Sequence, residues 1–322
     1  MSMSATTPGA KNTASTDRRE AESILVAVND RDQLHVRHFR GGTRNTSVVL
    51  LHDLFDDGSL FFRDSDALAP TLARAGFDVW VPDLRGKGRS FPALTPERAA
   101  EADYGFHAAI TEDLTTLFGL LREAAPDKPV YLVGHGVGGL LWLSFLARWP
   151  ILREMVRGVV LLGTTTAVER AGLYAALRWR VRDGFCARWF VRRRGLVPGR
   201  ALGLFSAAGA ANEAPRYYRE VRAVLEQGWI DPVDGLDHAA QLRELPHWPP
   251  TLVLAAECDA PWGGAAGGRL LQAQLPPHDG RLYVFPANRA VQLLGSRSAL
   301  AGGAGAGEVQ GLVLDWLINF DG

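Results

Sequence analysis

The stretch Val133-Gly134-His135-Gly136-Val137-Gly138-Gly139 decides the fold of this 322-residue chain. An apolar run, residues 129–132, precedes it, and a mostly apolar, helix-like segment from Leu140 to Trp149 follows it. A short apolar run that ends in a cluster of glycines and continues into an apolar helix indicates a buried strand, a tight turn and a buried helix. The stretch therefore predicts a strand–turn–helix unit in the core of an α/β domain.

Such a unit is the setting of the nucleophile elbow, G-x-S-x-G, in which a side chain on the turn attacks the substrate. In this chain the central position of the elbow holds Gly136. Glycine has no side chain, so no covalent acyl intermediate can form at that position. The glycines also match the dinucleotide pattern Gly134-x-Gly136-x-x-Gly139, but this unit is not the first strand–helix unit of the chain, as that pattern requires.

Short apolar runs on either side of the elbow predict a sheet. We expect strands at residues 24–28, 34–39, 47–51, 77–81, 130–133, 158–162, 251–254 and 282–285, and helices at 59–75, 108–124, 140–148 and 308–318. The first two strands form a hairpin, and the others alternate with helices. This order predicts an α/β fold with a mostly parallel, doubly wound sheet.

The pattern divides the chain into three parts. Residues 1–22 lack periodicity and are expected to be a disordered N-terminal tail. Residues 23–163 and 246–322 form the α/β core. Residues 164–245 contain no clear strand-like run and several helix-like segments, which predicts a helical lid inserted into the core.

Composition excludes several classes of protein. The hydrophobic content is 47%, the charged content 22% and the formal net charge zero, which predicts a globular domain with no overall attraction to nucleic acid. Cys186 and Cys258 make no metal or redox spacing and are expected to be free thiols. No secretion signal or apolar run of about 18 residues occurs, so a cytoplasmic location is expected, and the residue usage is typical of a GC-rich bacterial genome.

Four motifs in order resemble the α/β-hydrolase superfamily, in its esterase, lipase and serine-aminopeptidase branch. They are residues 50–55 (Leu-Leu-His-Asp-Leu-Phe), residues 83–90 (Asp-Leu-Arg-Gly-Lys-Gly-Arg-Ser), the elbow, and residues 257–259 (Glu-Cys-Asp). The resemblance covers roughly residues 34–320. It implies an α/β-hydrolase fold with a lid insertion and an ancestral acyl-transfer site.

The resemblance also implies where each part of that site lies. The nucleophile position is Gly136, and the acid position is Asp259, with Glu257 as a neighbouring candidate. Residues 289–295 resemble the family's histidine loop and place Ala290 at the base position, and no histidine follows His278. The oxyanion hole would use the backbone N–H groups of Leu54 and Val137, with His52 and His135 beside the same pocket. The superfamily usually has glycine where this chain has Asp53, which places negative charge near that pocket. No cofactor and no metal site are expected.

Two hypotheses follow for function. In the first, a protein of esterase or lipase-like ancestry has lost acyl-transfer catalysis at Gly136 and Ala290, and retains the binding of a small acyl or apolar ligand, or of a partner. In the second, it is an active carboxylic-ester or thioester hydrolase that activates water by an unusual route, with His52 or His107 as the base. The oligomeric state stays open.

An arginine-rich part of the expected lid permits a third hypothesis. Eight arginines lie between residues 178 and 200, and Leu173, Leu177, Val181, Phe185 and Trp189 recur every four residues. This spacing predicts a helix with an apolar stripe packed on the core and a solvated arginine face. Contact of that face with an anionic lipid surface, an acidic partner or a carboxylate substrate is the functional alternative.

Overall fold

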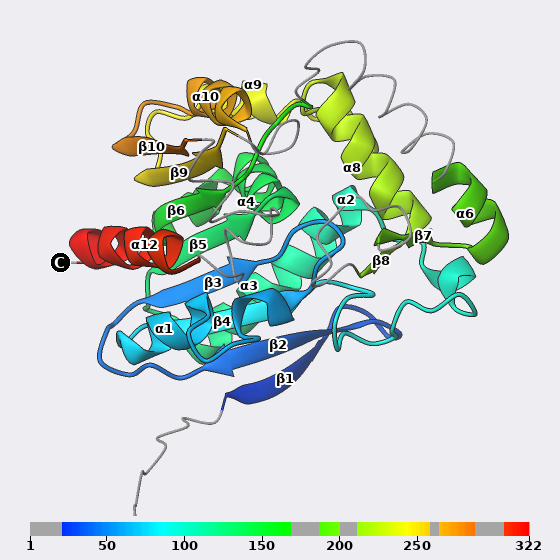
Figure 1. Cartoon of the computed structure of the whole chain (residues 1–322), viewed down its shortest axis with the longest axis horizontal. Helices are drawn as coiled ribbons and strands as arrows, with labels where there is room; N and C mark the ends of the chain where they lie inside the picture. The colour runs from blue at the N-terminus through cyan, green and yellow to red at the C-terminus, as the bar shows by residue number, and fades with distance from the viewer. Residues whose placement is uncertain (1–20, 169–186, 200–210, 258–263, 287–305, 322) are drawn as a thin grey trace, which may run out of the picture.

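A computed structural model describes residues 21–168, 187–199, 211–257, 264–286 and 306–321 (Figure 1). Its main sheet has eight strands, in the spatial order β1 (Glu22–Ala27), β2 (Gln33–Phe39), β4 (Asp78–Asp83), β3 (Ser47–Leu51), β5 (Val130–His135), β6 (Val156–Leu162), β9 (Thr251–Ala256) and β10 (Gly280–Phe285). β1 pairs antiparallel with β2 and β2 antiparallel with β4, and the remaining pairs are parallel. The predicted mostly parallel sheet is confirmed.

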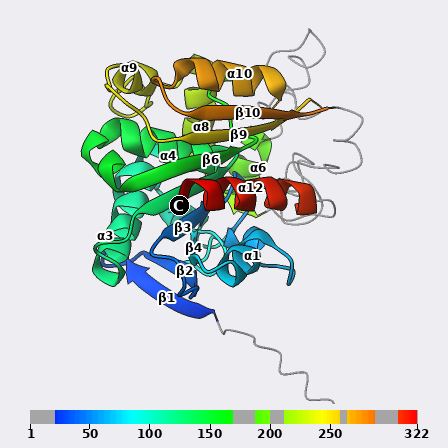
Figure 2. The same ribbon diagram turned by 90° about the vertical axis from the view of Figure 1, so that its left-hand side faces the viewer.

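Helices cover both faces of the sheet (Figure 2). One face carries α1 (Leu68–Arg74) and α12 (Ala306–Asp321), and the other carries α3 (Leu114–Ala124), α4 (Val137–Arg148), α9 (His238–Arg243) and α10 (Ala265–Gln274). The central strands β3, β4, β5 and β9 are buried along their whole length. Burial on both sides explains why these strands have continuous apolar sequences instead of alternating ones.

Two predicted helices differ from those observed. The helix expected over residues 59–75 is a 3-10 turn, η1 (Gly58–Phe61), followed by α1, because Asp64, Ser65 and Asp66 between them favour turns. The helix expected over residues 108–124 starts earlier, at α2 (Phe106–Ala108), and contains one π-helical turn, η3 (Ala109–Asp113), before α3. Two further 3-10 turns are η2 (Ala99–Glu101) and η4 (Pro150–Met155).

The part of the chain between β6 and β9, residues 163–250, is named here the β6–β9 segment. Its described residues form α6 (Ala187–Arg194), α8 (Pro215–Gln227), α9, and a two-stranded ribbon of β7 (Val197–Pro198) and β8 (Asn212–Glu213). The ribbon was not expected from the sequence, since strands of two residues show no periodicity. Figure 1 shows α6, α8 and the ribbon gathered at one end of the sheet.

Trp189 corrects one expectation for this segment. The predicted apolar stripe would bury its side chain, but Trp189 is 48% exposed and packs edge-on against Phe190, with ring centroids 5.0 Å apart. The side chain of Arg193 lies 5.7 Å from the Trp189 ring. The other four residues of the predicted stripe lie outside the described residues, as do Cys186 and Cys258.

Candidate active site

The predicted elbow is present between β5 and α4. Gly136 has φ of +51° and ψ of −115° and directly precedes the first residue of α4. Its backbone N–H donates a hydrogen bond to the Leu162 carbonyl in β6 (2.8 Å). A Cβ atom on Gly134 would overlap the backbone of Gly139, so the strand and helix approach more closely than any other residue type would allow.

The carboxylate of Asp53 fills the space in front of the elbow. Asp53 Oδ1 accepts a hydrogen bond from the backbone N–H of Val137 (2.7 Å), and the Asp53 residue is only 2% exposed. A Cβ atom built on Gly136 would fall within 2.5 Å of the Asp53 carboxylate. The volume where a nucleophilic side chain would begin is therefore occupied by a side chain from the loop after β3.

This position is favourable for a negative charge. The backbone N–H groups of the first helical turn have no partners within the helix, and the helix dipole adds a partial positive charge there. The N–H of Val137 is the same group that the sequence assigned to the oxyanion hole, where it would stabilise the charge of a reacting substrate. In this structure its hydrogen-bond partner is the carboxylate of Asp53.

A second buried carboxylate holds the backbone of the same loop. Glu213 in β8 accepts a hydrogen bond from the backbone N–H of Phe55 (2.6 Å) and forms an ion pair with Lys87. The Phe55 carbonyl accepts a hydrogen bond from the N–H of Ala211 (2.5 Å). Phe55 has φ of +62°, an unfavourable conformation for a residue with a side chain, and these bonds fix it.

The charges of this region influence one another. Burial raises the pKa of the Glu213 carboxyl, Lys87 opposes that rise, and the negative charge of Asp53 reinforces it. Burial also raises the pKa of the Tyr217 phenol, and Glu213 and Asp53 add to that effect. Tyr217 is therefore a neutral side chain beside two buried carboxylates.

His52 is committed to the backbone through both ring nitrogens. The N–H of Leu84 donates to Nε2 (3.3 Å), so Nε2 carries no proton, and Nδ1 donates to the carbonyl of Asp53 (2.9 Å). Burial lowers the pKa of His52, and the nearby Lys87 lowers it further. With its lone pair engaged, neutral His52 supports the loop, which opposes the hypothesis that it activates water.

His107 belongs to an ion cluster built from other elements. Its Nδ1 lies 2.9 Å from Asp231 Oδ2, and the same oxygen is 2.9 Å from Arg148 Nη2. Arg148 is the last residue of α4, whereas Gly136 precedes its first, so the cluster is joined to the helix at the end opposite the elbow. Arg148 also pairs with Asp234 (2.7 Å). These contacts give His107 a role in joining α2, α4 and the β6–β9 segment.

Asp53, Asp56 and His135 form a buried group of metal-ligand types. One ligand atom from each lies within 4.8 Å of the other two. Carboxylates and a histidine also bind backbone and side-chain hydrogen-bonding groups in protein interiors, so the grouping alone assigns no ion. The expectation that the chain binds no metal stays a prediction.

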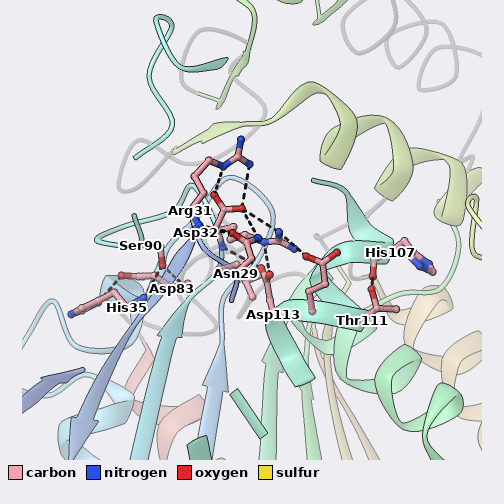
Figure 3. Close-up of polar contacts among 12 residues, drawn as sticks. Asn29, Arg31, Asp32, His35, Asp83, Ser90, His107, Thr111 and Asp113 are labelled. Carbon is pink, nitrogen blue, oxygen red and sulfur yellow. Dashed lines mark hydrogen bonds and ion pairs between the residues drawn. The ribbon is translucent and has the colours of Figure 1, made fainter. Parts of the chain in front are cut away.

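The motif of residues 83–90 folds around the side chain of Asp83, as Figure 3 shows in part. Its carboxylate contacts His35 Nδ1 (3.0 Å) and accepts hydrogen bonds from the N–H groups of Gly58 (2.7 Å) and Arg89 (3.0 Å). The Ser90 hydroxyl donates to the Asp83 carbonyl (2.6 Å). The motif is thus a structural loop that places Lys87 beside Glu213.

Arg85 of the same motif is buried and lies among three carboxylates, of which Asp32 and Asp113 are labelled in Figure 3. Its guanidinium is 2.6 Å from Asp113, 2.9 Å from Glu112 and 3.4 Å from Asp32. Burial raises the pKa of Asp113 to about 6, although Arg85 acts in the opposite direction. This cluster joins the β1–β2 hairpin to the π-helical turn.

Two of the predicted site residues lie outside the described residues, namely Asp259 and Ala290. Glu257, the neighbouring acid, directly follows β9 and is exposed. Leu54, the other predicted oxyanion donor, is 1% exposed, and His135 at the end of β5 is fully buried. The structure thus brings Gly136, Val137, His135 and the loop of residues 52–56 together.

Sequence reasoning missed Glu213. Its carboxylate accepts a hydrogen bond from the N–H of Phe55, 158 residues earlier in the chain. Glu213 itself lies in a stretch without a motif. Lys87 was part of a quoted motif, but only the fold reveals that its partner is in β8. A lysine in a mostly buried loop was the one available signal, because a buried cation requires a counter-charge.

The family model described as alpha/beta hydrolase fold matches residues 46–258, and the chain belongs to that family. Among curated proteins, it is 32% identical over 119 residues to triacylglycerol lipase 1 of Arabidopsis thaliana, covering 36% of this chain and 30% of that one. It is 25% identical over 159 residues to human lysosomal acid lipase/cholesteryl ester hydrolase, covering 46% and 40%. The chain thus spans well under half the length of these relatives.

Solved structures share the fold at low identity. A soluble variant of monoglyceride lipase from Saccharomyces cerevisiae has a TM-score of 0.67 and 14% identity, over 94% of this chain and 95% of that one. A thermophilic esterase from Thermogutta terrifontis has a TM-score of 0.58 and 18% identity, over 94% and 100%. These similarities show the α/β-hydrolase fold. Among the described residues, no helix combines the length and apolar character needed to cross a membrane.

Proposed function

We propose that this protein no longer performs acyl transfer at the elbow of its hydrolase fold and acts as a binding protein. The single observation that carries the proposal is the Asp53 carboxylate, which lies against Gly136 and accepts the Val137 N–H. An ester oxygen needs that N–H group in the transition state, and a nucleophile needs that volume. A carboxylate there also repels the developing negative charge of a tetrahedral intermediate.

Two features of the sequence support the proposal. Gly136 supplies no nucleophile, and no histidine occurs after His278 to act as its base. Glycine relieves the strain of the elbow conformation, which is about 1–3 kcal/mol for other residues. Loss of the nucleophile and occupation of its space by Asp53 are thus mutually compatible changes.

The retained role would be binding of an acyl or apolar ligand. Curated relatives are named lipases, and the name of one includes cholesteryl ester hydrolase, which supports a lipid-like ligand for the ancestral site. The fold of the described residues is well packed around the site, with a large core on each side of the sheet. A folded scaffold of this kind can keep a ligand or partner role without chemistry.

The test is a panel of p-nitrophenyl esters and thioesters together with fluorophosphonate labelling of the purified protein. The proposal expects no turnover above a heat-denatured blank and no mass increase in the intact protein. Clear turnover by homogeneous protein would contradict the proposal. The Asp53→Asn variant, assayed beside the unmodified protein, identifies any activity that belongs to this site and not to a contaminant.

The second candidate is an active hydrolase in which Asp53 is the base. The specific observation in its favour is the same position: a carboxylate in front of the elbow could accept a proton from a water molecule that attacks an ester carbonyl. In that case turnover exists in the unmodified protein and is lost in Asp53→Asn. The first proposal expects the two proteins to be equally inactive.

A further inference from the structure

A groove of about 420 Å³ lies between α6 and α8, on the β6–β9 segment. Its apolar part is formed by Val197 and Tyr218, which are buried, and by Val191 and Ala223, which are half-buried. The Tyr218 ring also packs edge-on against Phe55, with centroids 5.6 Å apart. The groove therefore has a fixed apolar floor that is continuous with the protein core.

Arginines from both helices line the groove. Arg188 comes from α6, and Arg219 and Arg222 come from α8. Arg222 pairs with Glu226 (2.6 Å), the one acidic residue that lines the groove. Within the described part of the chain, Arg188 and Arg219 make no ion pair, and neither does Arg192, a fourth arginine of the lining one helical turn after Arg188.

The local charge contrasts with the whole molecule. The chain has a formal net charge of zero, whereas the groove has four arginines and one glutamate. Unpaired guanidinium groups beside an apolar floor are the complement of a molecule with an anionic head and an apolar tail. A volume of 420 Å³ falls within the range of small-molecule sites.

We propose that this groove binds an amphiphilic anion, an alkyl chain that ends in a carboxylate or a phosphate. The head group pairs with Arg188, Arg192 and Arg219, and the chain lies on Val197 and Tyr218. A neutral lipid would leave the guanidinium groups without a counter-charge, and a small anion would leave the apolar floor uncovered. The inference goes beyond the loss of catalysis at the elbow, and its test can fail while that proposal stands.

Isothermal titration calorimetry of the full chain tests the ligand class with four probes. Decanoate and decyl phosphate carry both head and tail, acetate carries the head alone, and decanol carries the tail alone. We expect the better of the two amphiphilic anions to bind at least about tenfold more tightly than acetate or decanol, because both parts of the groove contribute. The comparison of decanoate with decyl phosphate identifies the preferred head group. Raising NaCl from about 50 mM to about 500 mM should weaken binding by roughly threefold, since the head-group contacts are partly exposed.

Variants assign the binding to the groove. The double variant Arg188→Gln with Arg219→Gln should weaken binding by roughly tenfold. Ala223→Phe fills the groove from α8 and should abolish binding without removing any charge. Arg281→Gln changes an exposed arginine in β10, outside the groove, and should leave the affinity within about twofold of the original.

Three results would overturn the proposal. One is the absence of binding by decanoate and decyl phosphate up to millimolar concentration. Another is binding that the double variant and Ala223→Phe leave unchanged. The third is arginine-dependent binding to vesicles of phosphatidylcholine and phosphatidylglycerol in the absence of any binding of monomeric amphiphile, which would make α6 and α8 a membrane contact instead.

Discussion

Asp53 Oδ1 and the backbone nitrogen of Val137 are 2.7 Å apart, which joins the loop after β3 to the first turn of α4. The bond is charge-assisted and lies at a helix N-terminus, two conditions under which a hydrogen bond contributes more than average to stability.

Removal of the Asp53 side chain should destabilise the protein. We expect Asp53→Ala to lower the free energy of unfolding by about 1–3 kcal/mol, because the Val137 N–H then loses its partner in a buried place. Asp53→Asn keeps an acceptor oxygen and should lose less. Urea unfolding followed by circular dichroism measures both, with Asp64→Ala, an exposed loop aspartate, as the control. Equal stability of Asp53→Ala and the control would show that the bond does not stabilise the fold.

Gly136→Ser should destabilise the unmodified protein but be tolerated better when Asp53 is also replaced by glycine. The new Cβ would overlap the Asp53 carboxylate, and φ at +51° adds strain of about 1–3 kcal/mol. In the double variant with Asp53→Gly the overlap disappears, so the two effects should be non-additive by at least about 1 kcal/mol. A double-mutant cycle of unfolding free energies gives that number. Additive effects would mean that the two positions do not share space.

The stability that the buried ion pair of Lys87 and Glu213 contributes should require both side chains. Lys87→Met leaves a buried carboxylate without its cation and should lower the free energy of unfolding by about 3 kcal/mol. Adding Glu213→Gln removes the charge but retains an acceptor for the Phe55 N–H, so the double variant should be more stable than Lys87→Met alone. Lys128→Met, in which the side chain is 30% exposed, should lose less than about 1 kcal/mol. A double variant with a lower free energy of unfolding than Lys87→Met alone would contradict the pairing.

His238 should make the protein less stable in mild acid. Burial lowers its pKa from 6.5 to about 4, while Asp231, 3.9 Å away, acts in the opposite direction. Below pH 6.5 the unfolded chain binds a proton that the folded protein resists, so stability falls as pH decreases from 6.5 toward 4, by about 3 kcal/mol from this group.

The variant His238→Phe isolates that contribution. Neither ring nitrogen of His238 has a hydrogen-bond partner among the described residues, so phenylalanine removes the titration without breaking a bond. The difference in unfolding free energy between His238→Phe and the unmodified protein should grow in favour of the variant as pH falls from 6.5 to 4. Asp113 has the opposite effect: its pKa is raised in the folded protein, so its protonation stabilises the fold as pH falls. This effect is common to both proteins and cancels in the difference between their unfolding free energies. A constant difference across this range would refute the prediction.

The sheet could be predicted from sequence because each buried strand is an apolar run with glycine or polar residues at its ends. The elbow could be predicted because only a tight turn between a strand and a helix explains glycines at 134, 136, 138 and 139. The start of α1 could not, since the sequence Phe62-Arg63-Asp64-Ser65-Asp66 is short enough to be read as helix or turn. Local patterns thus identify elements more reliably than their ends.

The site was predictable only in part. The sequence placed a negative charge near the pocket at Asp53, but the hydrogen bond to Val137 depends on the side-chain direction in a loop 84 residues away. Glu213 was out of reach because β8 has two residues and no pattern. His52 was assigned to the pocket as a possible base, whereas its tautomer follows from the Leu84 N–H, which only the fold brings to it.

The loss of acyl transfer at the elbow is tested most directly by ester hydrolysis with the purified protein beside its Asp53→Asn variant. We expect that neither protein hydrolyses p-nitrophenyl esters above the denatured blank, because Asp53 binds the Val137 N–H in the unmodified protein and Gly136 offers no nucleophile in either. Turnover by the unmodified protein that disappears in Asp53→Asn would contradict it, and would make Asp53 a catalytic residue of an active hydrolase.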